Sequence, residues 1–171
     1  MSNITFVGGI HGVGKGKVCS ELSSILNVNH LSASDVLKWG DVSPEKNNKL
    51  VANISDTQDR LIIGLKKVIE DGKSYLLDGH FCLLNSNGEI SKIPAKTFQD
   101  INPRIISVVT EDIHIIHQRL YKRDGKEYDI NTLAEMQSKE LEHAFEIAKT
   151  LGIPFFEINK RDYTLFLQSF N

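Results

Sequence analysis

The sequence predicts a three-layer α/β domain, in which a parallel five-stranded sheet carries helices on both faces. Short apolar, β-branched segments alternate along the chain with segments whose apolar residues recur at helical spacing. This alternation is typical of a parallel sheet with right-handed crossover helices. The segment 105–109 is apolar on both faces, as a parallel strand covered from both sides is. Because 171 residues suffice for one well-buried core, we expect a single domain over residues 1–171.

The strands are predicted from short apolar runs that end in turn residues. The run 3–7 stops at Gly8-Gly9, and the run 75–77 stops at Asp78-Gly79. Asn87-Gly88 lies between two short alternating segments, which is the strongest local signal for a hairpin, and we predict one at 81–93 on the rim of the sheet. The main-sheet strands are predicted at 3–7, 28–31, 75–77, 105–109 and 153–158.

The helices are predicted from apolar spacing and from signals at their ends. Small polar residues at 32–35 suit the start of one helix, and Ser55 with Gln58 forms a capping box at the start of the next. The charged stretch 121–130 has no apolar stripe, which predicts a lid-like loop between two later helices. Further helices are predicted at 18–26, 111–120 and 133–151.

Composition and charge limit the classes of partner. Lys and Arg number 20 against 22 Asp and Glu, so no global positive field is available to hold duplex nucleic acid, and any phosphate binding must be local. The two cysteines, Cys19 and Cys82, offer neither a disulfide framework nor a zinc spacing. Apolar runs fall far short of the roughly 20 residues of a membrane span. We expect a reduced, cytoplasmic protein with no membrane partner.

The most informative segment joins the first strand to the first helix. Glycines there let backbone N–H groups converge on a phosphate, and the N-terminus of the following helix adds positive potential. Lys15, at the end of the segment, can reach the β- and γ-phosphates of a nucleoside triphosphate. The alternative is a tight structural turn. The residues predicted to bind ATP are Gly9, Ile10, His11, Gly12, Val13, Gly14, Lys15, Gly16 and Lys17.

The positions after Lys15 depart from the common form of this phosphate loop, in which Ser or Thr ligates Mg²⁺. Gly16 and then Lys17 stand there, so no side-chain hydroxyl is present. The Gly-Lys-Gly order resembles adenylate kinases, in which Thr follows, and Lys17 breaks that pattern. Lys17 either touches the α-phosphate or points to solvent from the first helical turn. The departure leaves the handling of Mg²⁺ and the turnover rate open, more than nucleotide binding.

The resemblance to nucleoside monophosphate kinases of the P-loop NTPase fold extends over nearly the whole chain. The segment from His30 to Lys38 resembles their acceptor-binding region, with Lys38 where many members have Arg. Asp78-Gly79-His80 resembles the Asp-x-His of archaeal-type adenylate kinases. The order of Asn102-Pro103, strand, helix and long helix also follows that family. This resemblance implies ATP with Mg²⁺ as donor and a nucleoside monophosphate, with AMP as the best candidate, as acceptor.

Four residues are the predicted catalytic groups: Lys15, Asp78, Arg119 and Arg123. Asp78, at the carboxyl end of a central strand, can order the hydration shell of Mg²⁺, or it can act as a helix or turn cap. Arg119 and Arg123 lie four residues apart at the entrance to the charged stretch, where monophosphate kinases carry lid arginines. The alternative is a solvated basic helix end.

The acceptor is predicted to bind within about residues 32–55 and on neighbouring groups. Lysine replaces the arginines that usually hold a monophosphate, and it binds phosphate as a point charge rather than as a fork. His80 serves either catalysis or packing. The candidate acceptor-binding residues are Ser32, Asp35, Lys38, Lys49, Arg60 and His80.

Three functions fit these observations. The first is ATP-dependent phosphoryl transfer to AMP. The second is a nucleotide-binding or slowly hydrolysing regulatory module that acts on a protein or RNA partner, which Lys17 and the missing hydroxyl favour. The third is a P-loop kinase for another small molecule, such as a nucleoside, sugar or cofactor precursor, because the donor side would be the same.

Overall fold

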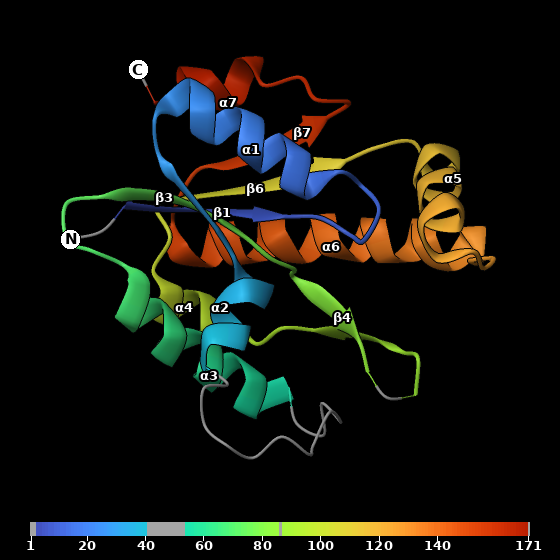
Figure 1. Ribbon diagram of the computed structural model, residues 1–171, viewed down its shortest axis with the longest axis horizontal. Coiled ribbons are helices and arrows are strands. Elements are labelled where there is room, and N and C mark those ends of the chain that lie inside the picture. The colour runs from blue at the N-terminus through green and yellow to red at the C-terminus, as the bar shows by residue number, and fades with distance from the viewer. Residues whose placement is uncertain (1–2, 41–53, 86, 171) are drawn as a thin grey trace.

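The computed structural model describes residues 3–40, 54–85 and 87–170 and contains one parallel sheet with helices on both faces (Figure 1). The main sheet has the strand order β2-β3-β1-β6-β7, and all its pairings are parallel. This confirms the predicted fold class. The main-sheet strands are β1 (Asn3–Gly8), β2 (Asn29–Ser32), β3 (Ser74–Asp78), β6 (Ile105–Thr110) and β7 (Phe155–Asn159).

The helices complete the alternating pattern, and two short ones were not predicted. The helices are α1 (Lys15–Leu26), α2 (Ala33–Gly40), α3 (Ile54–Val68), α4 (Ala95–Ile101), α5 (Ile113–Asp124), α6 (Ile130–Leu151) and α7 (Thr164–Gln168). Neither α4 nor α7 exceeds seven residues, which is too short for a clear helical period. Each buries a phenylalanine, Phe98 or Phe166, so packing rather than local pattern stabilises it.

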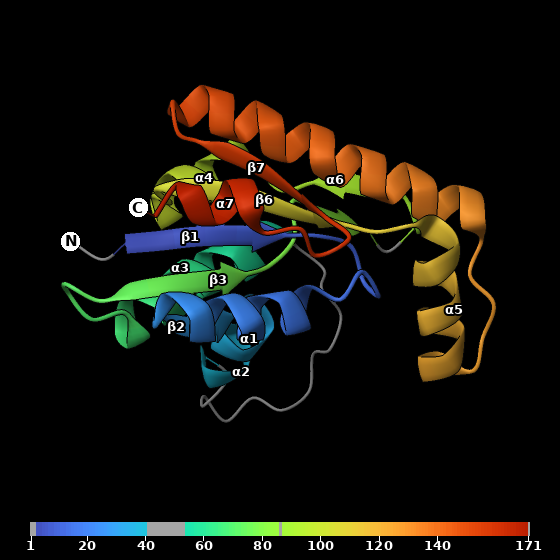
Figure 2. The ribbon, with the colours of Figure 1, turned by 90° about the horizontal axis from the view of Figure 1, so that it is seen from above.

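The two faces of the sheet bury separate apolar clusters. On β1, Ile4 and Phe6 point into the cluster shared with α3, α4 and α6, whereas Val7 belongs to the cluster with α1, α5 and α7. This alternation is the two-residue period of a strand buried on both faces. Figure 2 shows α6 running along the sheet while α5 stands beyond its end. The carboxyl ends of the strands therefore open toward α5.

The carboxyl ends of three strands meet at one level. Asp78, the last residue of β3, pairs with Ser32 of β2 on one side and with Val7 of β1 on the other. Gly8, one residue further along β1, pairs with Val108 of β6. In open parallel sheets ligands bind outside this edge.

The predicted hairpin is present beside that edge. Strands β4 (Cys82–Leu84) and β5 (Ile90–Lys92) pair antiparallel and form a separate two-stranded sheet. Gly88 has φ 78°, which the turn requires and which glycine adopts without strain.

The charged stretch predicted as a lid-like loop begins with helix. α5 continues through residues 121–124 and ends at Gly125, whose φ of 67° and backbone N–H to the carbonyl of Tyr121 close the helix. The segment from Gly125 to Asp129 then connects α5 to α6. The helix extends beyond the apolar stripe because no glycine or proline precedes Gly125 to stop it. Whether the stretch acts as a lid stays a prediction.

Among the described residues, none of the helices is long and apolar enough to cross a membrane.

Candidate functional site

The phosphate loop has the geometry that its glycines predict. Gly9, Gly12 and Gly14 have φ angles of 149°, 81° and 95°, which residues with a Cβ rarely adopt. A Cβ on Gly12 would also lie 2.7 Å from the side chain of Leu120. Gly14 is the N-cap of α1, and as a glycine it has no side chain to cap the N–H groups at the start of that helix. These N–H groups and the helix dipole make an anion-binding end directly beside Lys15.

A buried carboxylate holds the start of this loop. Glu140, from the middle of α6, is 0% exposed, and its Oε1 accepts hydrogen bonds from the backbone N–H of Gly9 and of Phe81, each at 2.9 Å. Its Oε2 accepts from the N–H of Cys82 at 2.7 Å. Burial raises the pKa of the Glu140 carboxyl, against the lowering effect of the three N–H groups. Glu140 thus fixes the phosphate loop and the base of the hairpin to one helix.

Asp78 lies between a cation and an imidazole. Its Oδ1 is 3.7 Å from Lys15 Nζ, and its Oδ2 is 2.6 Å from His30 Nε2. Burial raises the pKa of Asp78, but the hydrogen bond with His30 and the Lys15 charge outweigh it, so the pKa is lowered. Asp78 is therefore a carboxylate at neutral pH. His30 fixes its orientation.

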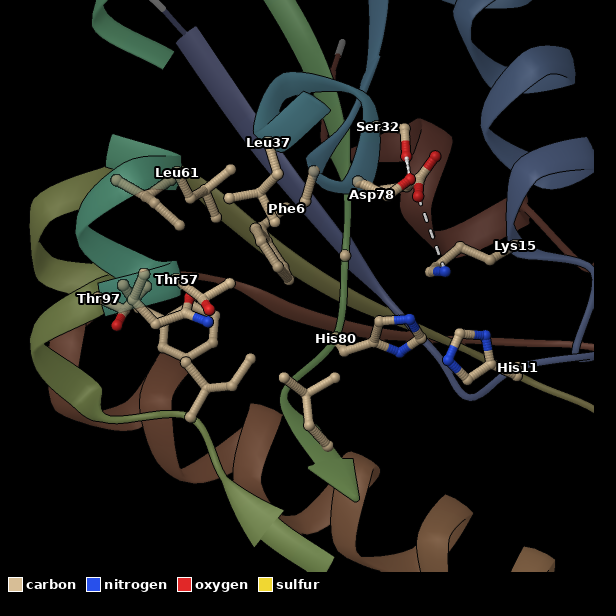
Figure 3. Close-up of a pocket in the computed structure, with 18 residues that line it drawn as sticks. Phe6, His11, Lys15, Ser32, Leu37, Thr57, Leu61, Asp78, His80 and Thr97 are labelled. Atoms are coloured by element: carbon tan, nitrogen blue, oxygen red, sulfur yellow. Dashed lines mark hydrogen bonds and ion pairs between the residues drawn. The ribbon is translucent and has the colours of Figure 1, made fainter. Parts of the chain in front are cut away.

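Two histidine rings lie next to Lys15. The rings of His11 and His80 have centroids 4.5 Å apart, and Figure 3 shows both beside Lys15. Burial, Lys15 and His11 together lower the pKa of His80 to about 3. Partial loss of hydration lowers the pKa of His11, and the charges of Lys15 and Arg123 lower it further. Both imidazoles are consequently neutral at pH 7.

The low pKa of His80 predicts acid sensitivity. An unfolded histidine titrates near pH 6.5, so between pH 6.5 and about 3 the unfolded chain binds the extra proton and the free energy of unfolding falls as the pH drops. We expect this residue to cost about 1 to 2 kcal/mol between pH 6.5 and 5. Urea unfolding of the parent and of His80→Gln at both pH values measures it. Equal losses in the two proteins would contradict the assignment.

An apolar cavity of about 360 Å³ opens beside Asp78 (Figure 3). Lys15, Asp78 and the two histidines form its polar end, near the phosphate loop. Its walls come from β1, α2, α3, α4 and the hairpin. We call it the apolar cavity. The apolar side chains that line it include Phe6, Leu61, Leu83, Ile93, Phe98 and Ile101, and the polar ones away from the loop are Thr57, Gln58 and Thr97.

A second cavity, also about 360 Å³, borders Lys15 as well. We call it the loop cavity, and it is lined by Ile10, His11, Gly12, Gly14, Lys15, Gly16, Arg119, Leu120 and Arg123. His11 and Lys15 line both cavities. Lys15 therefore stands where the contents of the two cavities would meet.

The two predicted lid arginines both reach the loop cavity, and both are held by carboxylates. Arg119 donates to the Val13 carbonyl at 3.0 Å and lies 3.3 Å from Oε2 of Glu111. Arg123 donates to both oxygens of Asp124, at 2.6 and 2.7 Å. The arrangement brings two guanidinium groups to the cavity that contains the phosphate loop.

The remaining predicted residues divide between the two cavities and the surface. Ser32 and His80 line the apolar cavity, whereas Asp35 and Arg60, both exposed, do not. Lys17 is exposed on the first turn of α1. Lys49 lies outside the described residues, as does most of the predicted acceptor segment. Val13 is buried in the core.

The sequence patterns did not predict the roles of several residues of this site. Glu140 had no motif around it, and His30 was named only as the start of the acceptor-like segment, so only the fold shows that they contact Gly9 and Asp78. Gln58 was predicted as half of a capping box, but it is 8% exposed and lines the apolar cavity. Its place three residues after Ser55 satisfied a capping pattern, which concealed that it also lies on the inner face of α3.

The ligand atoms of Cys19, His30 and Asp78 lie within 4.8 Å of one another. His30 and Asp78 already satisfy each other, and burial raises the pKa of Cys19 to about 12, which keeps it a thiol. This set is therefore better explained as support for Asp78 than as a metal centre.

Two solved structures share the fold of this chain. One is an uncharacterized protein from Eubacterium ventriosum, 18% identical with a TM-score of 0.52, where the match covers 98% of this chain and 95% of that chain. The other is a shikimate kinase from Acinetobacter baumannii in complex with shikimate, 18% identical with a TM-score of 0.58, covering 98% and 91%. At this identity the likeness concerns the fold, which is that of P-loop kinases.

No curated protein matches the sequence. A family profile described as an AAA domain matches residues 8–137, which include the phosphate loop, Asp78 and both arginines. The match spans more than half of the chain. This chain therefore belongs to the AAA domain family and has a P-loop kinase-like fold.

Proposed function

We propose that this protein transfers the γ-phosphoryl group of ATP to a small molecule bound in the apolar cavity. The observation that carries the proposal is the position of Lys15, which lines both the loop cavity and the apolar cavity. A nucleotide held by the phosphate loop would direct its terminal phosphate toward Lys15. An acceptor in the apolar cavity would face the same point. This is the arrangement that an in-line transfer requires.

The residues supply positioning and charge. N–H groups of the loop hold the phosphates, Lys15 neutralises the moving phosphoryl group, and Arg119 and Arg123 add positive charge from the side of α5. The neutral rings of His11 and His80 flank the junction without adding a competing charge. Asp78, oriented by His30, accepts a hydrogen bond from the attacking group.

Mg²⁺ is the metal ion that such a transfer would use. Asp78 is the only carboxylate among the described residues that line either cavity, and carboxylate oxygen suits this ion. Because Mg²⁺ keeps several of its waters when it binds a protein, Asp78 would hold the ion through water. When bound with ATP, the ion would neutralise charge on the β- and γ-phosphates.

The regulatory alternative is less well supported than a kinase. A module that only binds or slowly hydrolyses ATP needs no second cavity at Lys15, yet one of about 360 Å³ is present. AMP, the acceptor that the resemblance to adenylate kinases implies, is the reference acceptor for the assay.

A coupled assay with ATP, Mg²⁺ and a panel of acceptors that includes AMP tests the proposal. Transfer at roughly 1 to 100 per second, the usual range for kinases, supports it. Hydrolysis far below that range, unchanged by every acceptor, would favour the regulatory module.

The lid prediction has its own test. If residues 121–130 close over the donor, ATP releases Arg123 from Asp124 and protects this stretch from proteolysis and hydrogen exchange, and ADP protects it less. Arg119→Ala and Arg123→Ala should lower the transfer rate by about 10-fold or more, because these charges are needed most as the phosphoryl group moves. We expect nucleotide affinity to change less. Equal cleavage with and without ATP would mark an ordinary surface connection.

The exposed Lys17 gives a further prediction. We expect Lys17 to act as a phosphate clamp, so that Lys17→Thr removes a charge-assisted contact worth roughly 1.5 to 3 kcal/mol and weakens ATP binding by about tenfold or more. The loss should shrink at high salt, which screens an exposed charge. Titrations at two salt concentrations measure it, with transfer to AMP followed alongside. Faster transfer to AMP would instead indicate a restored adenylate kinase site, and unchanged affinity would place Lys17 in solvent.

A further inference from the structure

We infer that the acceptor is a neutral nucleoside rather than a nucleoside monophosphate. The inference rests on the proposed phosphoryl transfer and names its substrate class. It follows from the charges and shapes of the side chains that line the apolar cavity.

The charge of the lining opposes a phosphorylated acceptor. A phosphomonoester carries about −1.5 to −2 charges at neutral pH, and burying them without partners is costly. Among the described residues that line the apolar cavity, Lys15 is the only cation, because His11 and His80 are held neutral. Lys15 is already 3.7 Å from the Asp78 carboxylate and is needed by the donor phosphates. Among the described lining residues, none supplies a positive charge that is left for a second phosphate.

The walls fit an aromatic ring instead. Phe98 is 0% exposed and Phe6 is 2% exposed, and their rings meet edge to face with centroids 5.3 Å apart. Leu61, Ile93 and Ile101 continue the apolar surface. Phe6 and Phe98 pack against each other behind this surface and make it rigid, and burial of a flat apolar body against such walls is favourable.

The two ends of the cavity provide different polar groups. Gln58 and Thr97, which are 8% and 5% exposed, lie away from the loop and offer donors and acceptors that can pair with the edge of a base. Asp78 and Lys15 lie at the end near the loop, where a sugar hydroxyl would meet the γ-phosphate (Figure 3). A base, a compact sugar and a terminal hydroxyl match this order. A volume of about 360 Å³ suits a ligand of this size.

The chemical step balances with these groups. The oxygen of the nucleoside 5′-hydroxyl bonds to the γ-phosphorus, and the bond from that phosphorus to the bridging oxygen breaks. ADP leaves with the electron pair. The hydroxyl proton passes to the Asp78 carboxylate and from there to water, so the products are ADP, a nucleoside monophosphate and one proton.

The test compares adenosine, guanosine, cytidine and uridine with their own 5′-monophosphates. Binding to the full chain is measured by calorimetry without ATP, and transfer from ATP is measured separately. We expect at least one nucleoside to bind at least tenfold more tightly than its monophosphate and to be phosphorylated. A monophosphate that binds more tightly and accepts the phosphoryl group would overturn the inference, and so would the absence of binding by all four nucleosides.

Variants distinguish the cavity from the surface. Leu83→Arg adds a guanidinium to the lining and should shift the preference toward the monophosphate by about tenfold, whereas Leu84→Arg, on the next residue of β4 and outside this cavity, should not. If Leu83→Arg does not fold, Thr97→Val serves instead, and it should weaken nucleoside binding about fivefold with ATP affinity unchanged. Unchanged nucleoside binding in Thr97→Val would contradict the placement of the base.

The same measurements separate this inference from the proposed function. A protein that binds ATP and transfers to monophosphates alone retains the proposed function and loses the nucleoside. If the protein binds a nucleoside but transfers no phosphoryl group to any acceptor, the proposed function is wrong, whereas the assignment of a nucleoside to the apolar cavity is retained.

Discussion

Lys15→Ala should abolish phosphoryl transfer and leave the fold intact. Lys15 is the first residue of α1, and its side chain lines both cavities. Its Nζ lies 3.7 Å from Oδ1 of Asp78. Removing a charge that stabilises the transition state costs about 3 kcal/mol or more, which is roughly 100-fold or more in rate. The fold should persist, because the Lys15 side chain is not part of either buried apolar cluster.

The measurement is the rate of transfer from ATP, accompanied by circular dichroism and thermal unfolding. Lys149→Ala is the matched control, since Lys149 is an exposed lysine in the last turn of α6. It should retain the parental rate. Parental turnover in Lys15→Ala would show that the phosphate-loop assignment is wrong.

Glu140→Ala should be the most destabilising single change at the site. It would leave the N–H groups of Gly9, Phe81 and Cys82 buried without their partner, and each such orphan costs about 1 to 3 kcal/mol. We expect a loss of about 3 kcal/mol or more in the free energy of unfolding, together with weaker ATP binding. Glu140→Gln should lose less, because one oxygen remains to accept.

Urea unfolding at pH 7 measures this loss, with ATP affinity determined on the folded fraction. Glu142→Ala, on the same helix and exposed, is the control and should change the stability by less than about 0.5 kcal/mol. A Glu140→Ala protein as stable as the parent would mean that these N–H groups find water or another partner.

The sequence predicted the sheet well because its signals are local. The apolar run of β6 and the Asn-Gly pair of the hairpin each identify their element within a few residues. The phosphate loop was predicted for the same reason, because its glycines lie within a few residues of one another. Such features depend on backbone conformation, which nearby residues largely determine.

The rest of the site depends on contacts between distant residues. Glu140 lies 131 positions from Gly9, and the hydrogen bond between His30 and Asp78 spans 48. The apolar cavity exists because Phe98 from an unpredicted helix meets Phe6 from the first strand. Only the arrangement of the whole fold generates such juxtapositions, so a pattern within one segment could not predict them.

The close approach of Gly8 to Phe81 limits how this scaffold could be rebuilt. A Cβ on Gly8 would lie 2.4 Å from the Phe81 ring and 3.2 Å from Glu140. The hairpin therefore cannot be replaced by a hairpin from another protein without changes elsewhere in this fold. A graft that brings a new residue 81 must bring a matching residue 8 and keep the carboxylate of α6. A single substitution at position 8, 81 or 140 should therefore destabilise the fold, whereas matched substitutions at all three positions can preserve it.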